Sequence, residues 1–319
     1  MAGSQERVLR RRIRSIQSTR KTTRAMELIA ASRIVRAQQR IAGGRPYVER
    51  IDSLASDLVG APGTGHHRLI EPPDPLRRVA LVVITSDRGL CGAYNTQVLR
   101  TVERVLAEHR SEGHERMLVT VGRRGQSYLR FRGYDVEHTV VGITDRPTYL
   151  DARRVADMVV GPFLDGEVDQ IELISTRFVS AGSQRVEHRV VVPVPAHLRT
   201  EHEADGEGGG DTEGRVDYDA EPSEEEILDR LLPSLIEAQL FLALLDASAS
   251  EHASRQRAMK AATDNADDLV TTLRRVMNRA RQDTITTEIM DIVGGAEALR
   301  QVGDGHQTEP RSEPRSATT

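Results

Sequence analysis

Two long segments at the ends of the chain have the composition of helices, because each contains almost no glycine or proline. One covers about 6–59 with a single interruption at 43–46, and the other covers about 223–293 with only Pro233 inside it. At about 1.5 Å of rise per residue, such helices extend for about 70 Å and about 100 Å, well beyond the width of a small domain. They must therefore lie against each other or against something outside the chain. This geometry favours a shaft or scaffold over an enzyme.

Apolar residues recur three, four or seven positions apart in both segments, which predicts a narrow apolar stripe along each helix. Two stripes of this kind bury each other as a coiled coil, and segments so far apart in the sequence can pair antiparallel. The first stripe contains Leu9, Ile13, Ile16, Thr23, Ala30, Ile34, Ala37, Ile41, Val48, Ile51, Ala55 and Leu58. The second contains Ile227, Leu231, Leu235, Ala238, Leu242, Leu245, Ala249, Ala253, Ala262, Ala266, Leu269, Leu273, Val276, Ala280, Ile285, Ile289 and Ile292.

The region between these segments alternates between short β-branched apolar runs and helical stretches. This pattern predicts a mixed-sheet, Rossmann-like α/β domain over 76–195, in which crossover helices join parallel strands. A turn at 181–183 predicts that the last two strands form an antiparallel hairpin. The expected strands are 78–85, 116–121, 170–179 and 184–194, and the expected helices are 95–110, 123–131 and 149–163.

The expected fold class is therefore an α/β domain plus a long antiparallel α-helical coiled coil formed by the N- and C-terminal helices. The two coiled-coil helices are assigned to 1–60 and 224–299. An acidic, glycine-rich loop at 200–223 and a tail at 300–319 contain too few apolar residues to form a core. Both are expected to be disordered.

Composition limits the class of protein further. Aromatic residues make up only 3% of the chain, which is poor material for a large globular core. The single cysteine, Cys91, excludes an internal disulfide and suits a reducing compartment. No apolar run approaches the roughly 18 residues needed to span a bilayer, so we expect a soluble protein. The Arg-rich N-terminus is also typical of organellar transit peptides, but the helical spacing of Leu9, Ile13 and Ile16 favours a helix instead.

One candidate nucleotide site follows the first expected strand, at TSDRGLCG (85–92). Many nucleotide sites lie at such strand–helix junctions, because helix N-termini favour anions. The segment matches neither the P-loop pattern nor GxGxxG, and Asp87 would face the phosphate. We therefore favour a tight turn in which Asp87 and Arg88 pair locally. A nucleotide-using α/β enzyme centred on Asp87 remains an alternative.

Other catalytic or metal-binding groups are not apparent in the sequence. A nucleophilic Cys91 would need a nearby histidine base, and the ten histidines show no recurring partner spacing. We therefore expect a buried, inert thiol. The histidines at 66, 67, 197 and 202 have no second ligand pair at a metal-binding spacing. The expectation is a chain with no catalytic residue, no cofactor and no metal.

Basic residues crowd the first helical segment between Arg10 and Arg40, whereas 201–226 is heavily acidic; the net charge is −4. A basic helix face of this density could bind nucleic acid or an acidic protein surface. No aromatic residues interleave with the charges to stack bases, and a solvated face is the ordinary interpretation. One hypothesis is a coiled-coil scaffold that binds nucleic acid or an acidic partner through this helix. It predicts salt-sensitive binding to DNA or RNA.

Three blocks of the sequence resemble one protein family. They are RRRIRSIQSTRKTTRAMELIAASRIVRAQ (10–38), ITSDRGLCGAYN (84–95) and RQRAMKAATDNADDLVTTLRRVMNRARQDTITTEIMDIVGGAEAL (255–299). In this order and at these separations they resemble the γ subunit of rotary F-type ATP synthases. The most specific match is the pattern ARQxxITxEIxxIxGGA. The family has an antiparallel coiled coil of its terminal helices with an α/β domain at its base, as the periodicity predicts.

The resemblance implies a central rotor-stalk subunit, which mechanically couples hydrogen-ion or other ion flow through the membrane c-ring to ATP synthesis or hydrolysis. Nucleotide chemistry happens on the β subunits of the α3β3 ring, so the chain itself is expected to be non-catalytic. Its expected partners are the α and β subunits, the ε subunit and the c-ring of Fo, with no nucleic acid and no direct membrane insertion. The expected location is the cytoplasmic face of the bacterial cell membrane, as a peripheral protein.

The resemblance also assigns β-subunit contacts by position. Arg281 and Gln282 match residues that hydrogen-bond a catch loop of β. Arg24 and Met26 match the region that faces an acidic lever segment of β, which gives a physical reason for the basic face.

Two further groups near the helix tip follow from the same resemblance. One is expected to link the two helices and contains Arg255, Thr286, Glu288 and Asp291. The other is expected to form an apolar bearing inside a hydrophobic collar and contains Ile285, Ile289 and Ile292. The chain departs from the family in the tail after Leu299 and in the long acidic loop at 201–221, and we expect the tail to hang free rather than to brake rotation.

Overall fold

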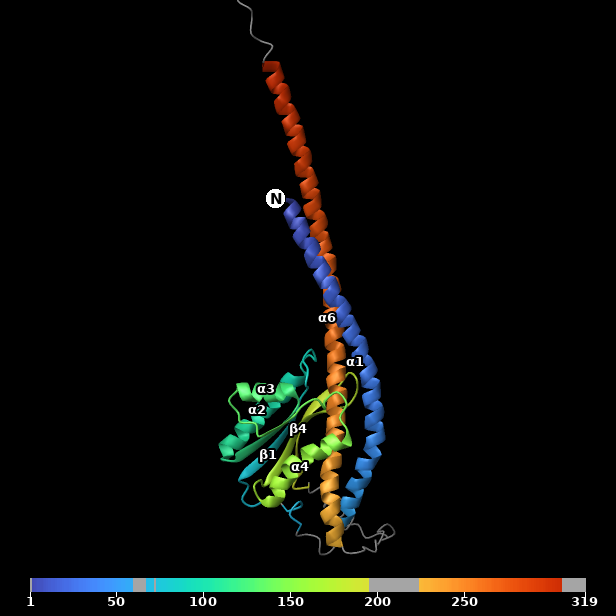
Figure 1. The fold of residues 1–319 in the computed structure, drawn as a ribbon, viewed down its shortest axis with the longest axis vertical. Coiled ribbons are helices and arrows are strands. Elements are labelled where there is room, and N and C mark those ends of the chain that lie inside the picture. Colours follow the sequence, from blue (N-terminus) through green and yellow to red (C-terminus); the bar gives the residue numbers. More distant parts are fainter. Residues whose placement is uncertain (1, 60–66, 72, 195–223, 306–319) are drawn as a thin grey trace, which may run out of the picture. The chain divides into compact units, whose positions relative to one another are not determined.

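The structure, a computed structural model, describes residues 2–59, 67–71, 73–194 and 224–305 (Figure 1). The acidic loop expected at 200–223 lies outside the described residues. The helices are α1 (Ala2–Val59), α2 (Tyr94–Glu112), α3 (Arg123–Phe131), α4 (Tyr149–Asp165) and α6 (Glu224–Gly305). The strands are β1 (Arg78–Ile84), β2 (Glu115–Val121), β3 (His138–Val140), β4 (Gln170–Phe178) and β5 (Gln184–Val192).

The chain divides into two compact units, one made of 1–24 and 261–319 and the other of 25–260. Helices α1 and α6 contribute to both. In the smaller unit, the hydroxyl oxygens of Thr23 and Thr263 lie 2.8 Å apart, and Arg20 forms an ion pair with Asp267. Residue numbers rise along α1 as they fall along α6, so the two helices pair antiparallel in this unit, as expected.

The same antiparallel pairing occurs independently in the larger unit. A buried apolar cluster joins the α1 stripe to α6 and contains Ile34, Ala37, Ile41, Leu245, Ala249 and Ala253, with Phe178 from β4. Farther along α1, the side-chain amide of Gln239 donates to a carboxylate oxygen of Asp52. The burial of these positions confirms the predicted apolar stripe of α1 and the first part of the α6 stripe. The prediction for the rest of the α6 stripe was wrong, because Leu269, Val276, Ile285, Ile289 and Ile292 are exposed.

The expected interruption of the first helix at 43–46 is wrong, because α1 continues through Gly43, Gly44 and Pro46. A side chain at Gly44 would place its Cβ 3.4 Å from Leu245 Cδ1 and 3.5 Å from Phe241 Cε1. Gly44 therefore faces α6 at ordinary van der Waals distance. Packing against α6 outweighs the weak helix propensity of this segment, as tertiary contacts often do.

The sheet has five strands in the order β3-β2-β1-β4-β5. Strands β1, β2, β3 and β4 pair parallel, and β4 pairs antiparallel with β5. This confirms the mixed sheet and the final hairpin. Every expected strand and helix of the middle region is present to within a few residues. Only the three-residue strand β3 was not predicted.

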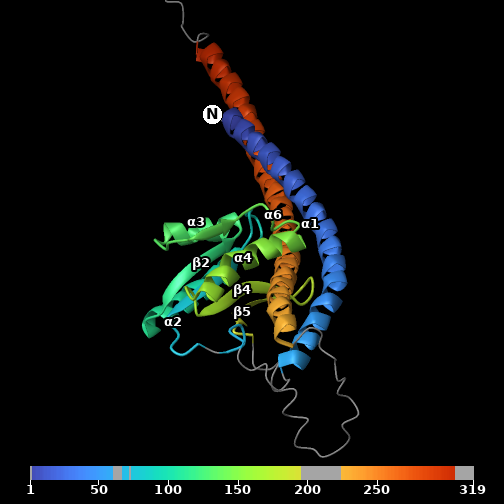
Figure 2. The ribbon, with the colours of Figure 1, turned by 60° about the horizontal axis from the view of Figure 1, so that its bottom comes forward.

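Helices cover both faces of the sheet (Figure 2). One face packs on α2 and α3 through a cluster that includes Leu81, Val83, Val102 and Leu129. The other face packs on α4 and on parts of α1 and α6 through a second cluster that includes Val82, Val155 and Leu235. Strand β1 is therefore buried on both faces, as its continuous apolar run RVALVVI requires.

Helix α6 differs from the expectations in two respects. It ends at Gly305, six residues beyond the expected boundary at 299, so the first part of the tail is helical, and 306–319 lie outside the described residues. By length and composition it also contains a stretch apolar enough to cross a membrane, with a mean hydropathy of 1.4. This corrects the expectation that no segment approaches membrane-spanning length. Because 61% of that stretch is buried within the protein, its apolar side chains are used in packing.

Candidate functional site: the joint between the sheet and helix α6

The block ITSDRGLCGAYN forms the end of β1, the turn after it and the start of α2. A hydrogen-bonded network fixes the turn: the Ser86 amide donates to the side-chain oxygen of Asn95 at 3.0 Å, and the Asn95 amide lies 3.2 Å from the Cys91 sulfur. Leu90 and Gly92 adopt positive φ angles of 63° and 55°. The turn therefore holds several backbone carbonyls in fixed positions on its outer side.

Helix α6 docks on these carbonyls. The Ser254 hydroxyl donates to the Cys91 carbonyl at 2.6 Å, and the Arg255 guanidinium donates to the Gly89 carbonyl at 3.3 Å. Gly92 lies so close that an added Cβ would be 3.3 Å from Ser254 Oγ. Together with its positive φ, this approach explains why the position carries glycine.

A buried ion pair lies behind this contact. Arg255 Nη2 is 2.6 Å from Glu251 Oε1, and the Glu251 side chain is only 1% exposed. Burial raises the pKa of the Glu251 carboxyl, and the charge of Arg255 opposes that rise. Arg255 therefore both neutralises Glu251 and reaches the β1–α2 turn.

A second contact joins the loop that precedes α4 to both long helices. The Asp145 carboxylate accepts ion pairs from Arg33 of α1 at 2.9 Å and from Arg88 at 3.6 Å. The Asp145 carbonyl accepts the Ser248 hydroxyl of α6 at 3.2 Å and lies 3.5 Å from His252 Nε2. The loop thus bridges α1, the β1–α2 turn and α6 within the unit 25–260.

The environment of His252 suits a neutral ring. Burial, and next the charge of Arg255, lower the pKa of His252 to about 4. Six residues earlier, burial raises the pKa of Asp246 to about 6 against the opposing charges of Arg45, Arg177 and Arg189. This stretch of α6 therefore contains one acidic and one basic side chain whose pKa values are both strongly shifted.

The nucleotide interpretation of 85–92 does not agree with the geometry. The Asp87 carboxylate accepts the backbone amides of Arg123 at 3.1 Å and Gly142 at 2.8 Å, and the Thr144 hydroxyl at 3.1 Å. Asp87 therefore ties the turn to the start of α3 and to the loop after β3, and its negative charge stays beside the turn. The segment is a structural turn, although Asp87 pairs with backbone amides rather than with Arg88 as expected.

Cys91 is buried, as expected, and burial raises the pKa of its thiol. A raised pKa leaves little thiolate at neutral pH, which makes a thiol a poor nucleophile. The surroundings of Cys91 in the described residues are therefore those of a structural thiol.

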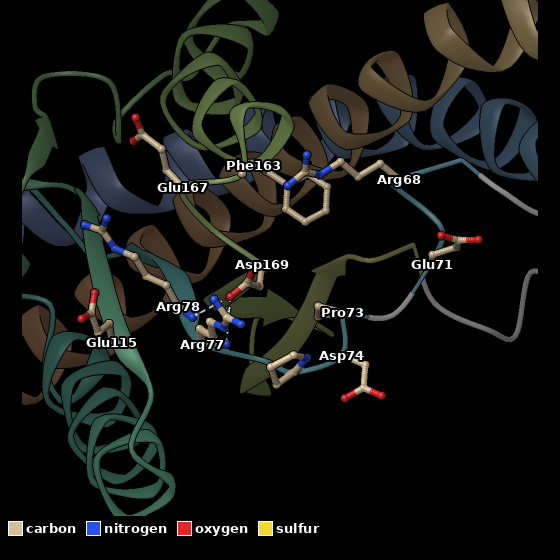
Figure 3. A pocket seen from close by; sticks show the side chains of 12 residues that line it. Arg68, Glu71, Pro73, Asp74, Arg77, Arg78, Glu115, Phe163, Glu167 and Asp169 are labelled. Atoms are coloured by element: carbon tan, nitrogen blue, oxygen red, sulfur yellow. Dashed lines mark hydrogen bonds between the residues drawn. The ribbon is translucent and has the colours of Figure 1, made fainter.

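A pocket of about 630 Å³ lies at the amino-terminal edge of β1 (Figure 3). Its lining mixes Arg68, Arg77 and Arg78 with several carboxylates, and Asp169 accepts the backbone amides of both Arg77 and Arg78 at 2.8 Å. Ligands of open α/β sheets bind at the opposite, carboxyl edge of the strands. The pocket therefore gives no support to an enzyme site.

The expected β-subunit contacts have surface positions. Arg24, Arg281 and Gln282 are exposed, and Met26 is half-buried. The expected bearing residues are also exposed, with 44% of Ile285, 55% of Ile289 and 72% of Ile292 accessible. A row of exposed isoleucines on one helix is unusual for a surface that meets only water.

The expected helix-linking group is not brought together. Thr286, Glu288 and Asp291 are exposed on α6 in the smaller unit, and the Thr286 hydroxyl donates to the Gln282 carbonyl one turn earlier. Arg255 belongs to the larger unit, where it pairs with Glu251 and the β1–α2 turn. Arg255 is therefore part of the joint with the sheet. This corrects its expected place in the helix-linking group, and the tertiary contacts of Arg255 are the reason.

Part of the basic face also has partners within the chain. Arg33 pairs with Asp145, Arg40 donates to the Pro147 carbonyl, and Arg20 pairs with Asp267. These arginines hold α1 in place, which a solvated or nucleic-acid-binding face would not require.

A group of possible metal ligands was not predicted from the sequence: His109, Glu112 and His114. Their spacing, HxxExH around a glycine, was the available signal.

Comparisons with known proteins agree with the fold. The family model described as ATP synthase matches residues 5–299. An ATP synthase gamma chain from Parafrankia sp. (strain EAN1pec) is 47% identical over 304 residues, covering 94% of this chain and 99% of the relative. The gamma chain from Mycolicibacterium smegmatis is 43% identical over 307 residues, covering 92% and 97%.

Solved structures with the same fold include two mitochondrial assemblies. A chain of the Tetrahymena thermophila ATP synthase central stalk and c-ring superposes with a TM-score of 0.55 at 26% identity, covering 76% of this chain and 99% of that one. A chain of the Euglena gracilis ATP synthase OSCP/F1/c-ring structure has a TM-score of 0.66 at 16% identity, covering 98% and 100%.

The terminal helices pair antiparallel, and the mixed sheet between them in the sequence docks on α6. This arrangement defines a central-stalk subunit of a rotary ATP synthase. Within that class, the chain belongs to the family of ATP synthase γ chains, the rotor subunit of the F-type enzyme. The alternative of a nucleic-acid-binding scaffold has no support from these relatives.

Proposed function

We propose that this chain is the non-catalytic rotor of its complex, turning inside an α3β3 ring whose β subunits carry out ATP synthesis and hydrolysis. The observation that carries this proposal is the exposed row on α6, where Arg281 and Gln282 precede Ile285, Ile289 and Ile292. Within the described residues, the structural roles of Asp87 and Cys91 support a chain without chemistry of its own.

The partners follow from the same proposal. The α and β subunits would surround the α1–α6 pair, and the ε subunit and the c-ring of Fo would contact the α/β domain. Ion flow through the ring would then turn the sheet, and the contacts of Ser254, Arg255 and Asp145 would transmit torque to the helices. The complex would lie on the cytoplasmic face of the bacterial membrane, with this chain peripheral. Rotation would hold the three β subunits in different conformations, each biased by a different face of the helices.

The β-subunit contacts are expected to be individually weak. Exposed ion pairs contribute about 0–1 kcal/mol each. Arg24 and Arg281 would therefore act together with the neutral side chains of Gln282 and Met26 rather than through one decisive bond. Exposed Ile285, Ile289 and Ile292 would slide in an apolar collar, where non-directional contacts allow rotation.

Gln282→Ala in the assembled complex tests this proposal. Because Gln282 is exposed, the substitution should leave folding and assembly intact while it lowers ATP synthesis in inverted membrane vesicles severalfold. Asn265→Ala, on an exposed part of the same helix, is the matched control and should synthesise ATP at the wild-type rate. Equal synthesis by both variants and the wild type would remove Gln282 from the contact with β.

A further inference from the structure

A cluster of two histidines and a glutamate lies at the C-terminal end of helix α2, whereas the joint lies at its N-terminal end. His109 is in the last turn of α2, Glu112 is its final residue, and His114 follows the C-cap Gly113. Gly113 has a left-handed φ of 80°, and the His114 amide donates to the His109 carbonyl at 2.9 Å. This C-cap turn folds the chain back on itself and brings both imidazoles to one place.

The donor atoms of the cluster have the separations of a metal site. His109 Nδ1 and His114 Nδ1 are 3.2 Å apart, and Glu112 Oε2 is 3.2 Å from His114 Nδ1 and 3.9 Å from His109 Nδ1. A tetrahedral Zn²⁺ with bonds of about 2.0–2.1 Å requires its donors to be about 3.3–3.4 Å apart. Small rotations of the Glu112 side chain, which is 60% exposed, would equalise the three distances.

A buried carboxylate orients the first ligand. His109 Nε2 lies 3.0 Å from Glu172 Oε2, and this carboxylate also accepts His188 Nε2 at 2.6 Å and the Gln170 amide at 2.6 Å. The contact with the Glu172 carboxylate favours the ring proton of His109 on Nε2, which leaves the Nδ1 lone pair facing His114. Metal-binding histidines commonly have such a carboxylate behind them.

We propose that His109 Nδ1, His114 Nδ1 and a carboxylate oxygen of Glu112 form a binding site for a divalent transition metal of the zinc type. Two imidazoles and a carboxylate are the ligands that Zn²⁺ takes in sites with three protein ligands, and a water would complete the tetrahedron. Bound metal would join the end of α2 to the start of β2. A metal that binds the folded chain would stabilise this part of the sheet, and the stabilisation would rise with the logarithm of the free metal concentration above its Kd.

Titration of the full-length chain with Co²⁺ tests the site directly. We expect one Co²⁺ per chain, with intense visible absorption of a tetrahedral complex and no thiolate charge-transfer band, since Cys91 is remote from the cluster. His114→Ala and Glu112→Gln, both at the helix end, should weaken Co²⁺ binding at least tenfold while the circular dichroism spectrum stays unchanged. His138→Ala, at an exposed histidine of β3, is the matched control and should bind like the wild type.

Glu172→Gln tests the positioning role of the buried carboxylate. It should weaken binding by about 10- to 100-fold with the tetrahedral spectrum retained, because it disturbs the orientation of His109 and not the ligand set. Equal Co²⁺ affinities of the wild type and His114→Ala would overturn the proposal. So would the absence of one-to-one binding in the wild type, which would mean that a shared proton alone holds the two imidazoles together.

Discussion

Arg255 illustrates how a single residue connects a helix to a sheet. Its guanidinium neutralises the buried Glu251 carboxylate and also reaches the carbonyls of Arg88 and Gly89. One oxygen of Glu251, Oε2, is buried with no hydrogen-bond partner among the described residues. The buried carboxylate therefore depends on Arg255 for a compensating charge. In the rotor, this contact lies where torque would pass from the sheet to α6.

Arg255→Met should destabilise the isolated chain by about 3 kcal/mol, because removing one partner leaves a buried carboxylate uncompensated. The double variant with Glu251→Leu should recover part of that loss, since it removes the stranded charge as well. Urea unfolding of the three variants measures both effects. If the double variant were as unstable as the sum of the two single changes, the pair would make no coupled contribution.

Asp246 and His252 give opposite pH dependences within one stretch of α6. The folded pKa of Asp246, about 6, lies above its unfolded value, so its contribution to stability falls as pH rises from about 4 to 6. The folded pKa of His252, about 4, lies below its unfolded value, so its contribution falls as pH drops from about 6.5 to 4. Each shift corresponds to at most about 3 kcal/mol, and the two largely cancel in the wild type.

Asp246→Asn should remove that cancellation. The variant is expected to be more stable than the wild type at pH 7, where the wild-type carboxylate is ionised and buried, and to lose stability more steeply between pH 6.5 and 4. His252→Gln should show the reverse slope. Urea midpoints of the three proteins across pH 4–7.5 measure these slopes, and parallel curves would mean that neither group has the proposed protonation in the folded chain.

At the scale of elements, two neighbouring glycines of α1 have different surroundings. Gly44 faces Leu245 and Phe241 of α6, whereas a side chain at Gly43 would meet no atom within 4 Å. Substitutions at these two neighbouring glycines therefore distinguish the effect of helix packing from the effect of helix propensity.

Gly44→Leu should destabilise the chain by about 1–3 kcal/mol, because the added side chain overpacks the contact with α6. Gly43→Leu should be neutral or stabilise the chain by up to about 1 kcal/mol, because it replaces glycine inside an exposed helix. Thermal unfolding of both variants provides the comparison. Similar destabilisation by both changes would show that α6 does not constrain this part of α1.

The elements with long, regular patterns were predictable from the sequence. The apolar stripe of α1 reappears as buried Ile13, Ile34 and Ile41, because burial on one side of a helix imposes the 3.6-residue period. The core strand β1 was equally clear, since burial on both faces requires a continuous apolar run. Strand β3 was not, because three residues are too few to show a period.

Features that depend on tertiary contacts were not predictable in the same way. Gly44 and Pro46 predicted a break that packing against α6 overrides. Family resemblance placed Arg255 with a helix-tip group, whereas its partner Glu251 and the β1–α2 turn assign it to the joint. The spacing HxxExH marks His109 and His114 as candidates, but it does not show that the left-handed C-cap at Gly113 folds the chain back and brings them together.

At the scale of the whole molecule, a rotor needs its two chain ends to behave as one mechanical element. Pairing of α1 with α6 is antiparallel in each compact unit. Thr23 meets Thr263 in one unit, and Ile34 and Ala37 pack on α6 in the other. A rotor requires this pairing to persist during turnover, because ends that slid past each other would dissipate the torque that the sheet receives.

Disulfide cross-linking of Thr23→Cys with Thr263→Cys, in a Cys91→Ala background, tests that claim most directly. The two hydroxyl oxygens are 2.8 Å apart, so the cysteines should cross-link in high yield in the assembled complex. Thr23→Cys with Thr287→Cys, on an exposed part of the same helix, is the control and should not cross-link. We predict that the cross-linked complex retains ATP synthesis within about twofold of its reduced form, because helices that turn together lose nothing by being joined. Failure to cross-link, or loss of synthesis that reduction restores, would contradict the account.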